Sequence, residues 1–171
     1  ICFATSPYVL RLEDLAAARD TDPEKLSKGL LLKEQSVAPI TEDIVTLAAT
    51  AADYILTDED KKAIDMVILA TESGIDQSKA AAVFVHGLLD IQPFARSFEM
   101  KEACYVATAA LDYAKLHVEK FPQSKVLVIA SDIAKYGIGT PGEPTQGAGA
   151  VAMLISHNPR ILSFNDDKEA Q

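Results

Sequence analysis

Cys104 is the residue whose position best suits nucleophilic chemistry, because it stands where an extended segment gives way to an alanine-rich helix. Residues 93–98 have the composition of a strand, and residues 103–120 are rich in helix formers, with apolar side chains at three- and four-residue spacing. The sequence therefore predicts Cys104 in the first turn of a helix. Unpaired N–H groups and the positive end of the helix dipole lie there, and both stabilise a thiolate and an oxyanion. The alternative interpretation is a buried cysteine that packs as a small hydrophobic residue.

Glu72 is the second candidate, because it follows the apolar run at 65–70. A continuous run of this kind is typical of a strand buried on both faces of a parallel sheet. In an open α/β sheet, ligands bind outside the carboxyl ends of the strands. Parallel strands before Glu72 and Cys104 would bring a thiol nucleophile and a carboxylate base to one edge. The alternative for Glu72 is a solvated loop carboxylate.

The elements that must position this pair alternate along the chain. Helices are expected at 12–19, 23–28, 41–55 and 78–89, and strands at 125–132 and 148–155, with a further strand-like segment at 160–164. This alternation predicts the α/β fold class, with a parallel or mixed sheet that carries helices on its faces. A long Gly/Pro-rich loop is expected at 136–147, and loops of this kind often serve a site.

The composition limits both the size of the folded unit and the kinds of partner that the protein can bind. A chain of 171 residues that is 49% hydrophobic is long enough for one compact unit. Its formal net charge of −9 and its pI near 4.7 argue against binding to nucleic acid or to anionic membranes, since both need clustered cations. The apolar runs are also shorter than the roughly 18 residues that a membrane span needs. We therefore expect neither nucleic acid nor membrane among its partners.

Cys2 and the three histidines give no clear indication of a further reactive site. Two cysteines far apart in the chain, without a C-x-x-C motif, favour a reducing cytoplasm over a disulfide framework, and Cys2 is interpreted as buried filler. His86, His117 and His157 are expected to have structural or surface roles, and the sequence contains no cluster with metal-ligand spacing. The chain starts directly in apolar sequence without an initiator methionine, which favours a fragment of a longer protein.

Three segments carry a family resemblance. They are FARSFEMKEACY at 94–105, ATES at 70–73 and GEPTQGAGA at 142–150. They closely resemble the 3-hydroxy-3-methylglutaryl-CoA (HMG-CoA) synthases of the bacterial mevalonate pathway, and the resemblance runs along essentially the whole chain. It implies a thiolase-like fold, in which two similar α/β halves surround paired central helices. Residues 1–171 would form the N-terminal half, with a mixed sheet and the nucleophile at the start of a central helix, and the second half would be absent.

The resemblance also implies a reaction, that of an acyltransferase. Cys104 would be acetylated by acetyl-CoA, Glu72 would remove a methyl proton, and the carbanion would attack the ketone of acetoacetyl-CoA before hydrolysis. Tyr136, Thr145 and Asp22 match substrate-contacting positions of the family. The family implies a cytoplasmic homodimer that needs no cofactor besides its CoA thioester substrates. Its catalytic histidine comes from the second half, so we expect this chain alone to be inactive.

Two alternatives stay open at this point. A ketoacyl-synthase-like condensing enzyme of the same fold would pair the cysteine with histidine and asparagine, or with two histidines, and Glu72 and the Gly-Glu-Pro-Thr loop disfavour it. A noncatalytic thiolase-fold interaction domain would keep the fold without turnover. If acetyl-CoA protects Cys104 from an alkylating reagent, the second alternative is disfavoured.

Overall fold

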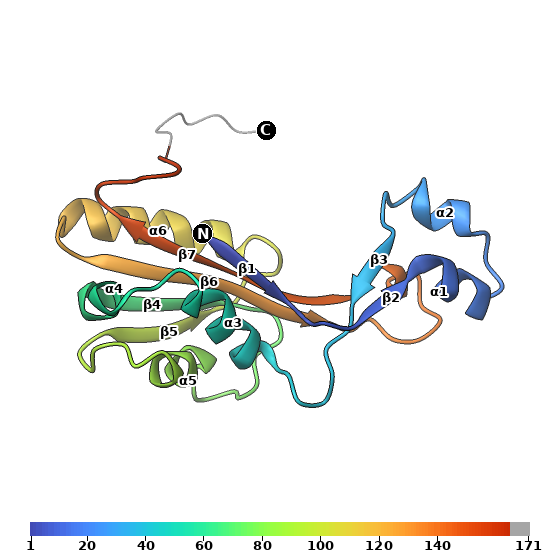
Figure 1. Ribbon diagram of the computed structural model, residues 1–171, viewed down its shortest axis with the longest axis horizontal. Coiled ribbons are helices and arrows are strands. Elements are labelled where there is room, and N and C mark those ends of the chain that lie inside the picture. The colour runs from blue at the N-terminus through green and yellow to red at the C-terminus, as the bar shows by residue number, and fades with distance from the viewer. Residues whose placement is uncertain (165–171) are drawn as a thin grey trace.

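A mixed five-stranded sheet forms the centre of the protein, which is described here by a computed structural model covering residues 1–164 (Figure 1). The strands lie in the order β1-β7-β6-β4-β5. Their bounds are β1 (Cys2–Thr5), β4 (Ile64–Ala70), β5 (Arg96–Met100), β6 (Lys125–Ala134) and β7 (Gly147–Ser156). The strands β4, β5 and β6 are parallel, whereas β7 runs antiparallel to both β6 and β1. The mixed sheet and the strands predicted at 65–70, 125–132 and 148–155 are thus confirmed, and the last of these, β7, lies inside the sheet but is only partly buried.

Helices cover both faces of this sheet. On one face lie α3 (Ile44–Asp53) and α5 (Ala81–Leu88), and on the other lies α6 (Val106–Lys120), as Figure 1 shows. The short helix α4 (Asp58–Ala63) leads into β4. Within residues 1–164, none of the helices combines the length and the apolar character that crossing a bilayer requires.

The continuous apolar runs of β4 and β6 follow from this covering. Successive strand side chains point to opposite faces, so each run supplies two cores. Val67 and Leu69 pack in the cluster under α3 and α5, whereas Met66 and Ile68 pack in the cluster under α6. All four side chains are buried. Each such burial stabilises the fold by about 1.5–3 kcal/mol.

A small lobe, residues 9–36, projects from the end of the sheet (Figure 1). It contains β2 (Val9–Arg11), α1 (Leu12–Ala18), α2 (Pro23–Ser27) and β3 (Glu34–Ser36), and β2 pairs with β3 in an antiparallel ribbon. The lobe has its own apolar cluster, which consists of the buried side chains of Leu12, Leu15, Ala16 and Leu26. The two helices predicted at 12–19 and 23–28 are therefore confirmed.

Several predicted boundaries are wrong for local reasons. The helix expected from residue 78 begins at Ala81, because the Asp76 carboxylate accepts hydrogen bonds from the Ser78 and Lys79 N–H groups and forms a turn. The helix expected from residue 41 begins at Ile44, where the Asp43 carboxylate caps the Val45 and Thr46 N–H groups.

Four elements and one segment also differ from the sequence analysis. Residues 160–164 are not a strand, and the helix α4 and the short strands β1, β2 and β3 were not expected. Cys2 is half-buried in β1 rather than buried filler. The strand β1 lies at the outer edge of the sheet, where one side of its backbone has no neighbouring strand among residues 1–164.

Candidate functional site

The carboxyl ends of the parallel strands β4, β5 and β6 lie along one rim of the sheet, and the candidate residues follow these ends. Glu72 comes two residues after β4, Cys104 four residues after β5, and Tyr136 two residues after β6. The Cys104 Sγ lies 3.7 Å from the Glu72 Oε1, so the thiol donates a hydrogen bond to the carboxylate. Both residues are exposed at the rim. The proximity expected from the strand pattern is therefore present, while the chemical roles of the two residues stay a prediction.

Cys104 lies on a tight turn just before α6 and not in its first turn. The helix begins at Val106, three residues later than the sequence predicts. Ala103 has a φ of 42°, a left-handed conformation that an L-residue in a helix does not adopt. The Tyr105 N–H donates to the Glu102 carbonyl oxygen at 3.2 Å and closes the turn. The turn thus places the thiol at the rim, two residues before the helix, and the N–H of the first helical residue, Val106, donates to the Ala103 carbonyl oxygen at 3.3 Å.

Glu72 is held through its backbone by Asp132, which lies on β6. One carboxylate oxygen of Asp132 accepts from the Glu72 N–H at 2.8 Å and from the Ser73 N–H at 3.1 Å. The same oxygen accepts from the hydroxyls of Thr71 and Ser73, each at 3.0 Å. A carboxylate with four donors on one oxygen fixes the start of the loop that carries Glu72. No role for Asp132 was predicted from the sequence, although its position after the apolar run of β6 matches that of Glu72 after β4.

Glu99, on β5, holds the same loop from the other side. Its Oε2 accepts a hydrogen bond from the Ala81 N–H at 2.9 Å, which caps α5. A side chain at Gly74 would place its Cβ 2.6 Å from the Glu99 Oε1, so the loop passes close against this carboxylate. Residues 71–81 are therefore fixed by carboxylates from both strands that flank β4.

The loop between β6 and β7, residues 135–146, contains Tyr136 and Thr145. The Gln146 Oε1 accepts hydrogen bonds from the Tyr136 N–H at 2.8 Å and from the Gly137 N–H at 3.2 Å. The Thr145 hydroxyl donates to the Gly142 carbonyl oxygen at 2.8 Å. Both Tyr136 and Thr145 are exposed, and the loop begins after β6 has run four residues past Ala130, which pairs with the last residue of β4.

Asp22 lies in the small lobe, where it caps α2. Its Oδ1 accepts a hydrogen bond from the Glu24 N–H at 2.9 Å. This cap accounts for an acidic residue before Pro23 without any ligand. Substrate contact by Asp22, Tyr136 and Thr145 stays a prediction.

The histidines have structural partners, as expected. The His86 ring nitrogens lie 2.9 Å from the Ser97 Oγ and 3.0 Å from the Ile91 carbonyl oxygen. The His117 Nε2 lies 3.1 Å from the Asp65 Oδ1. His157 is exposed just beyond β7. Among residues 1–164, no group of three or more His, Cys, Asp or Glu side chains is arranged to hold a metal ion.

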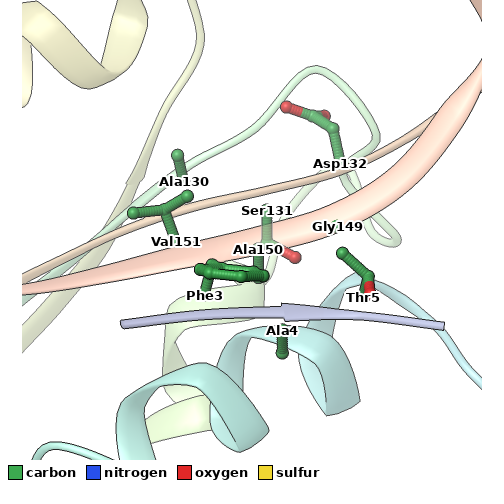
Figure 2. A pocket seen from close by; sticks show the side chains of 9 residues that line it. All are labelled: Phe3, Ala4, Thr5, Ala130, Ser131, Asp132, Gly149, Ala150 and Val151. Atoms are coloured by element: carbon green, nitrogen blue, oxygen red, sulfur yellow. The ribbon is translucent and has the colours of Figure 1, made fainter. Parts of the chain in front are cut away.

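A shallow hollow of about 340 Å³ lies on the sheet face between β1, β6 and β7 (Figure 2). Most of its lining is apolar, including Phe3, Ala130 and Val151, and Asp132 lies at its edge. Neither Cys104 nor Glu72 lines it. The contact between Cys104 and Glu72 therefore lies outside this hollow, on the open rim of the sheet.

Comparison with known proteins gives concordant matches. Residues 5–160 match the family model described as hydroxymethylglutaryl-coenzyme A synthase N terminal. A hydroxymethylglutaryl-CoA synthase from Enterococcus faecalis is 60% identical over 167 residues, which cover 98% of this chain and 44% of that protein.

Solved structures agree with these matches. A crystal structure of HMG-CoA synthase complexed with CoA superposes with a TM-score of 0.92 at 72% identity, covering 93% of this chain and 41% of that one. MvaS in complex with 3-hydroxy-3-methylglutaryl coenzyme A gives a TM-score of 0.86 at 42% identity, covering 91% and 38%. The chain thus spans less than half the length of these relatives. The similarity confirms the thiolase-like α/β fold expected from the sequence.

Proposed function

The chain belongs to the hydroxymethylglutaryl-coenzyme A synthase N-terminal family, and we propose that it supplies the nucleophile and the base of an enzyme that condenses acetyl-CoA with acetoacetyl-CoA. The observation that carries this proposal is the 3.7 Å contact between the Cys104 Sγ and the Glu72 Oε1. A nucleophile beside a carboxylate suits a reaction that needs both covalent attachment and removal of a carbon-bound proton.

The proposed reaction has three steps. The Cys104 thiolate attacks the acetyl-CoA carbonyl and displaces the CoA thiolate, so that an acetyl-cysteine forms. Glu72 then takes a proton from the acetyl methyl group, and the resulting carbanion forms a bond to the ketone carbon of acetoacetyl-CoA. The ketone oxygen becomes an alkoxide and takes a proton from the histidine that the remaining length of the enzyme would supply. Water finally cleaves the thioester that joins the product to Cys104. The reaction needs no cofactor beyond its two CoA thioester substrates.

Covalent attachment explains why the chemistry needs this geometry. The methyl group of a thioester is a weak acid, so a carboxylate that diffuses freely in water does not remove its proton efficiently. Attachment to Cys104 would place the methyl group beside Glu72 and make the proton transfer intramolecular, which removes several kcal/mol from the barrier. The backbone hydrogen bonds from Glu72 and Ser73 to Asp132 fix the loop that carries this base.

The wider assignments belong to the same proposal. Asp22, Tyr136 and Thr145 would contact the substrates, and the remaining length found in the relatives would supply the rest of the pocket, including a histidine. We propose a cytoplasmic homodimer that acts in the mevalonate pathway and, for the isolated chain, no measurable turnover. The similarity to enzymes solved with CoA and with HMG-CoA supports the class of substrate.

The proposal is tested in the full-length protein, meaning this chain together with the remaining length present in its relatives. The measurements are acetyl-adduct formation with labelled acetyl-CoA and product formation with acetoacetyl-CoA. Glu72→Gln should still form the adduct, but its condensation rate should fall by about 10²–10⁴-fold, the contribution of a positioned general base. Cys104→Ser should abolish both, because a serine hydroxyl is far less ionised than a thiol.

Cys2→Ser is the matched control and should leave both measurements unchanged. An adduct on Cys2, or no adduct on the wild-type protein, would contradict the nucleophile assignment and favour a noncatalytic domain. Condensation by Glu72→Gln at the wild-type rate would show that another group removes the proton.

A further inference from the structure

An ion pair joins the small lobe to the 135–146 loop. The Arg19 Nε and Nη2 donate to the two carboxylate oxygens of Glu143 at 2.9 and 2.7 Å, in a bidentate arrangement. The partners are 124 residues apart in the chain. Arg19 ends α1, whereas Glu143 begins the 3-10 turn η1 (Glu143–Thr145). The contact therefore links two parts of the protein that the chain itself does not connect directly.

Glu143 is buried, although it lies in a surface loop. Only 6% of its surface is exposed, and its Oε2 also accepts a hydrogen bond from the Gly139 N–H at 2.8 Å. A buried carboxylate that loses its cation leaves an uncompensated charge, so the segment that carries it must move toward water. The guanidinium is a planar fork that matches both carboxylate oxygens, and a lysine ammonium does not reproduce this geometry. The pair is thus specific for arginine.

Glu143 is the anchor of a loop that is otherwise closed on itself. The Thr140 hydroxyl donates to the Tyr136 carbonyl oxygen at 2.9 Å, and the Gln146 side chain accepts from the Tyr136 N–H. Gly142 lies so close to Tyr136 that an added Cβ would be 2.8 Å from the tyrosine Cβ. The loop should therefore shift as one unit, carrying Tyr136 with it, when its anchor is released.

The position of the pair determines what such a shift would change. The loop follows the carboxyl end of β6, the strand whose Asp132 binds the Glu72 backbone, and the lobe lies beyond that same end of the sheet (Figure 1). The loop that carries Glu72 is held by different contacts, namely those of Asp132 and Glu99, and Cys104 contacts Glu72. Release of the ion pair should therefore move the surface around Cys104 and Glu72 and leave their contact in place.

We propose that Arg19 and Glu143 form a positioning clamp that fixes the Tyr136 loop against the small lobe, and that this clamp sets the affinity of the rim for acyl thioesters without taking part in the chemistry at Cys104. The inference rests on the proposed function, since that function supplies the thioester. Arg19 and Glu143 are positioning residues, because each acts through the loop.

The test uses the full-length protein with Arg19→Lys, Glu143→Gln and the exchange variant Arg19→Glu/Glu143→Arg. For both single variants we expect the KM for acetyl-CoA to rise by about 10-fold or more, the order expected when a binding element is misplaced by up to an ångström. The kcat and the amount of acetyl-Cys104 at saturating acetyl-CoA should stay close to wild type. In the exchange variant, the KM for acetyl-CoA should return part of the way to the wild-type value. Lys28→Gln, which breaks an exposed pair with Glu24 in the same lobe, is the matched control and should change nothing.

Trypsin cleavage after Lys135 provides a second measurement that does not depend on turnover. Lys135 is exposed and directly precedes Tyr136, so release of the loop should accelerate this cleavage in both single variants but not in Lys28→Gln. If wild-type protein forms no acetyl-Cys104, the proposed function fails, and this cleavage still reports on whether the pair holds the loop.

The proposal is overturned if KM and cleavage after Lys135 both match wild type in the single variants. It is also overturned if kcat falls at constant KM, because the pair would then act on the chemistry or on folding alone. If Glu143→Gln does not fold, the KM and the cleavage rate of Arg19→Lys, which keeps the positive charge, decide whether the pair acts as a clamp.

Discussion

Replacement of Asp132 by alanine should release the loop that carries Glu72. The variant removes one acceptor oxygen that binds the Glu72 and Ser73 N–H groups and the Thr71 and Ser73 hydroxyls. A hydrogen bond to a charged group contributes about 1.5–3 kcal/mol, but four donors on one oxygen do not add. Water can replace the carboxylate at the exposed Glu72, whereas the fully buried Thr71 hydroxyl would lose its acceptor and keep only the hydrogen bond that it accepts from the Ser73 N–H.

We expect Asp132→Ala to lower the free energy of unfolding by about 3 kcal/mol, mostly because the Thr71 hydroxyl proton and one of the backbone N–H groups lose their acceptor. Asp132→Asn keeps an acceptor oxygen without the charge and should cost about 1 kcal/mol. The condensation rate of Asp132→Ala should fall by about 10²-fold, because the base shifts relative to the acetyl group.

The assay is urea unfolding of the full-length protein together with the condensation rate. Asp112→Ala, at an exposed position on α6, is the matched control and should stay within about 0.5 kcal/mol of wild type. Asp132 does not hold the Glu72 loop if Asp132→Ala is as stable as Asp112→Ala and condenses at the wild-type rate. Loss of stability with full condensation would show that Asp132 supports the fold but not the base.

Three further predictions concern other parts of the chain. Leu31 is exposed and has a left-handed φ of 55°, so Leu31→Gly should raise the free energy of unfolding in urea by about 0.5–1 kcal/mol, whereas Leu30→Gly should lower it. The hydrogen bonds from Arg19 lower the pKa of Glu143, so its ionised form stabilises the fold fully above the unfolded value of about 4.3, and this contribution is lost as the pH falls through the folded pKa. The difference in unfolding free energy between wild type and Glu143→Gln should therefore be constant from neutral pH to about pH 5 and shrink below it, and a difference that grows in acid would contradict this. Cys104 is exposed and Cys2 is half-buried, so iodoacetamide should label Cys104 first, as mass spectrometry of the two peptides would show; equal labelling would argue against an activated Cys104.

The sequence predicts the sheet well, because burial on both faces leaves a clear pattern. The strands β4 and β6 lie between helices, so residues 66–70 and 126–130 are all apolar and these runs stand out from amphipathic segments. The same rule places Glu72 and Cys104 at one rim, since the direction of a parallel strand fixes where its carboxyl end lies. The contact between the two side chains was therefore accessible from the order of the elements alone.

The small strands and the start of α6 could not be predicted, because long-range pairing and a single backbone angle decide them. The strands β2 and β3 are three residues each, and they form through pairing between segments that are distant in sequence. Ala103 favours a helix by propensity, yet its left-handed φ ends the strand segment and delays the helix. Asp132 was missed because its partners are about 60 residues away, on a loop whose path the sequence does not specify.

Two separate sets of contacts hold the Glu72 loop and the Tyr136 loop, and we expect them to affect different steps of the proposed reaction. The side chains of Cys104 and Glu72 follow neighbouring parallel strands, and carboxylates on β5 and β6 fix the loop that carries the base. The loop with Tyr136 and the lobe with Asp22 are instead joined to each other by the Arg19–Glu143 pair. Changes at Asp132 should therefore affect carbon–carbon bond formation, whereas changes at the pair should affect thioester affinity. A double variant, Asp132→Asn with Arg19→Lys, should show the two effects as independent factors, because the two sets of contacts share no residue. Strong non-additivity would mean that the rim and the lobe respond as one unit.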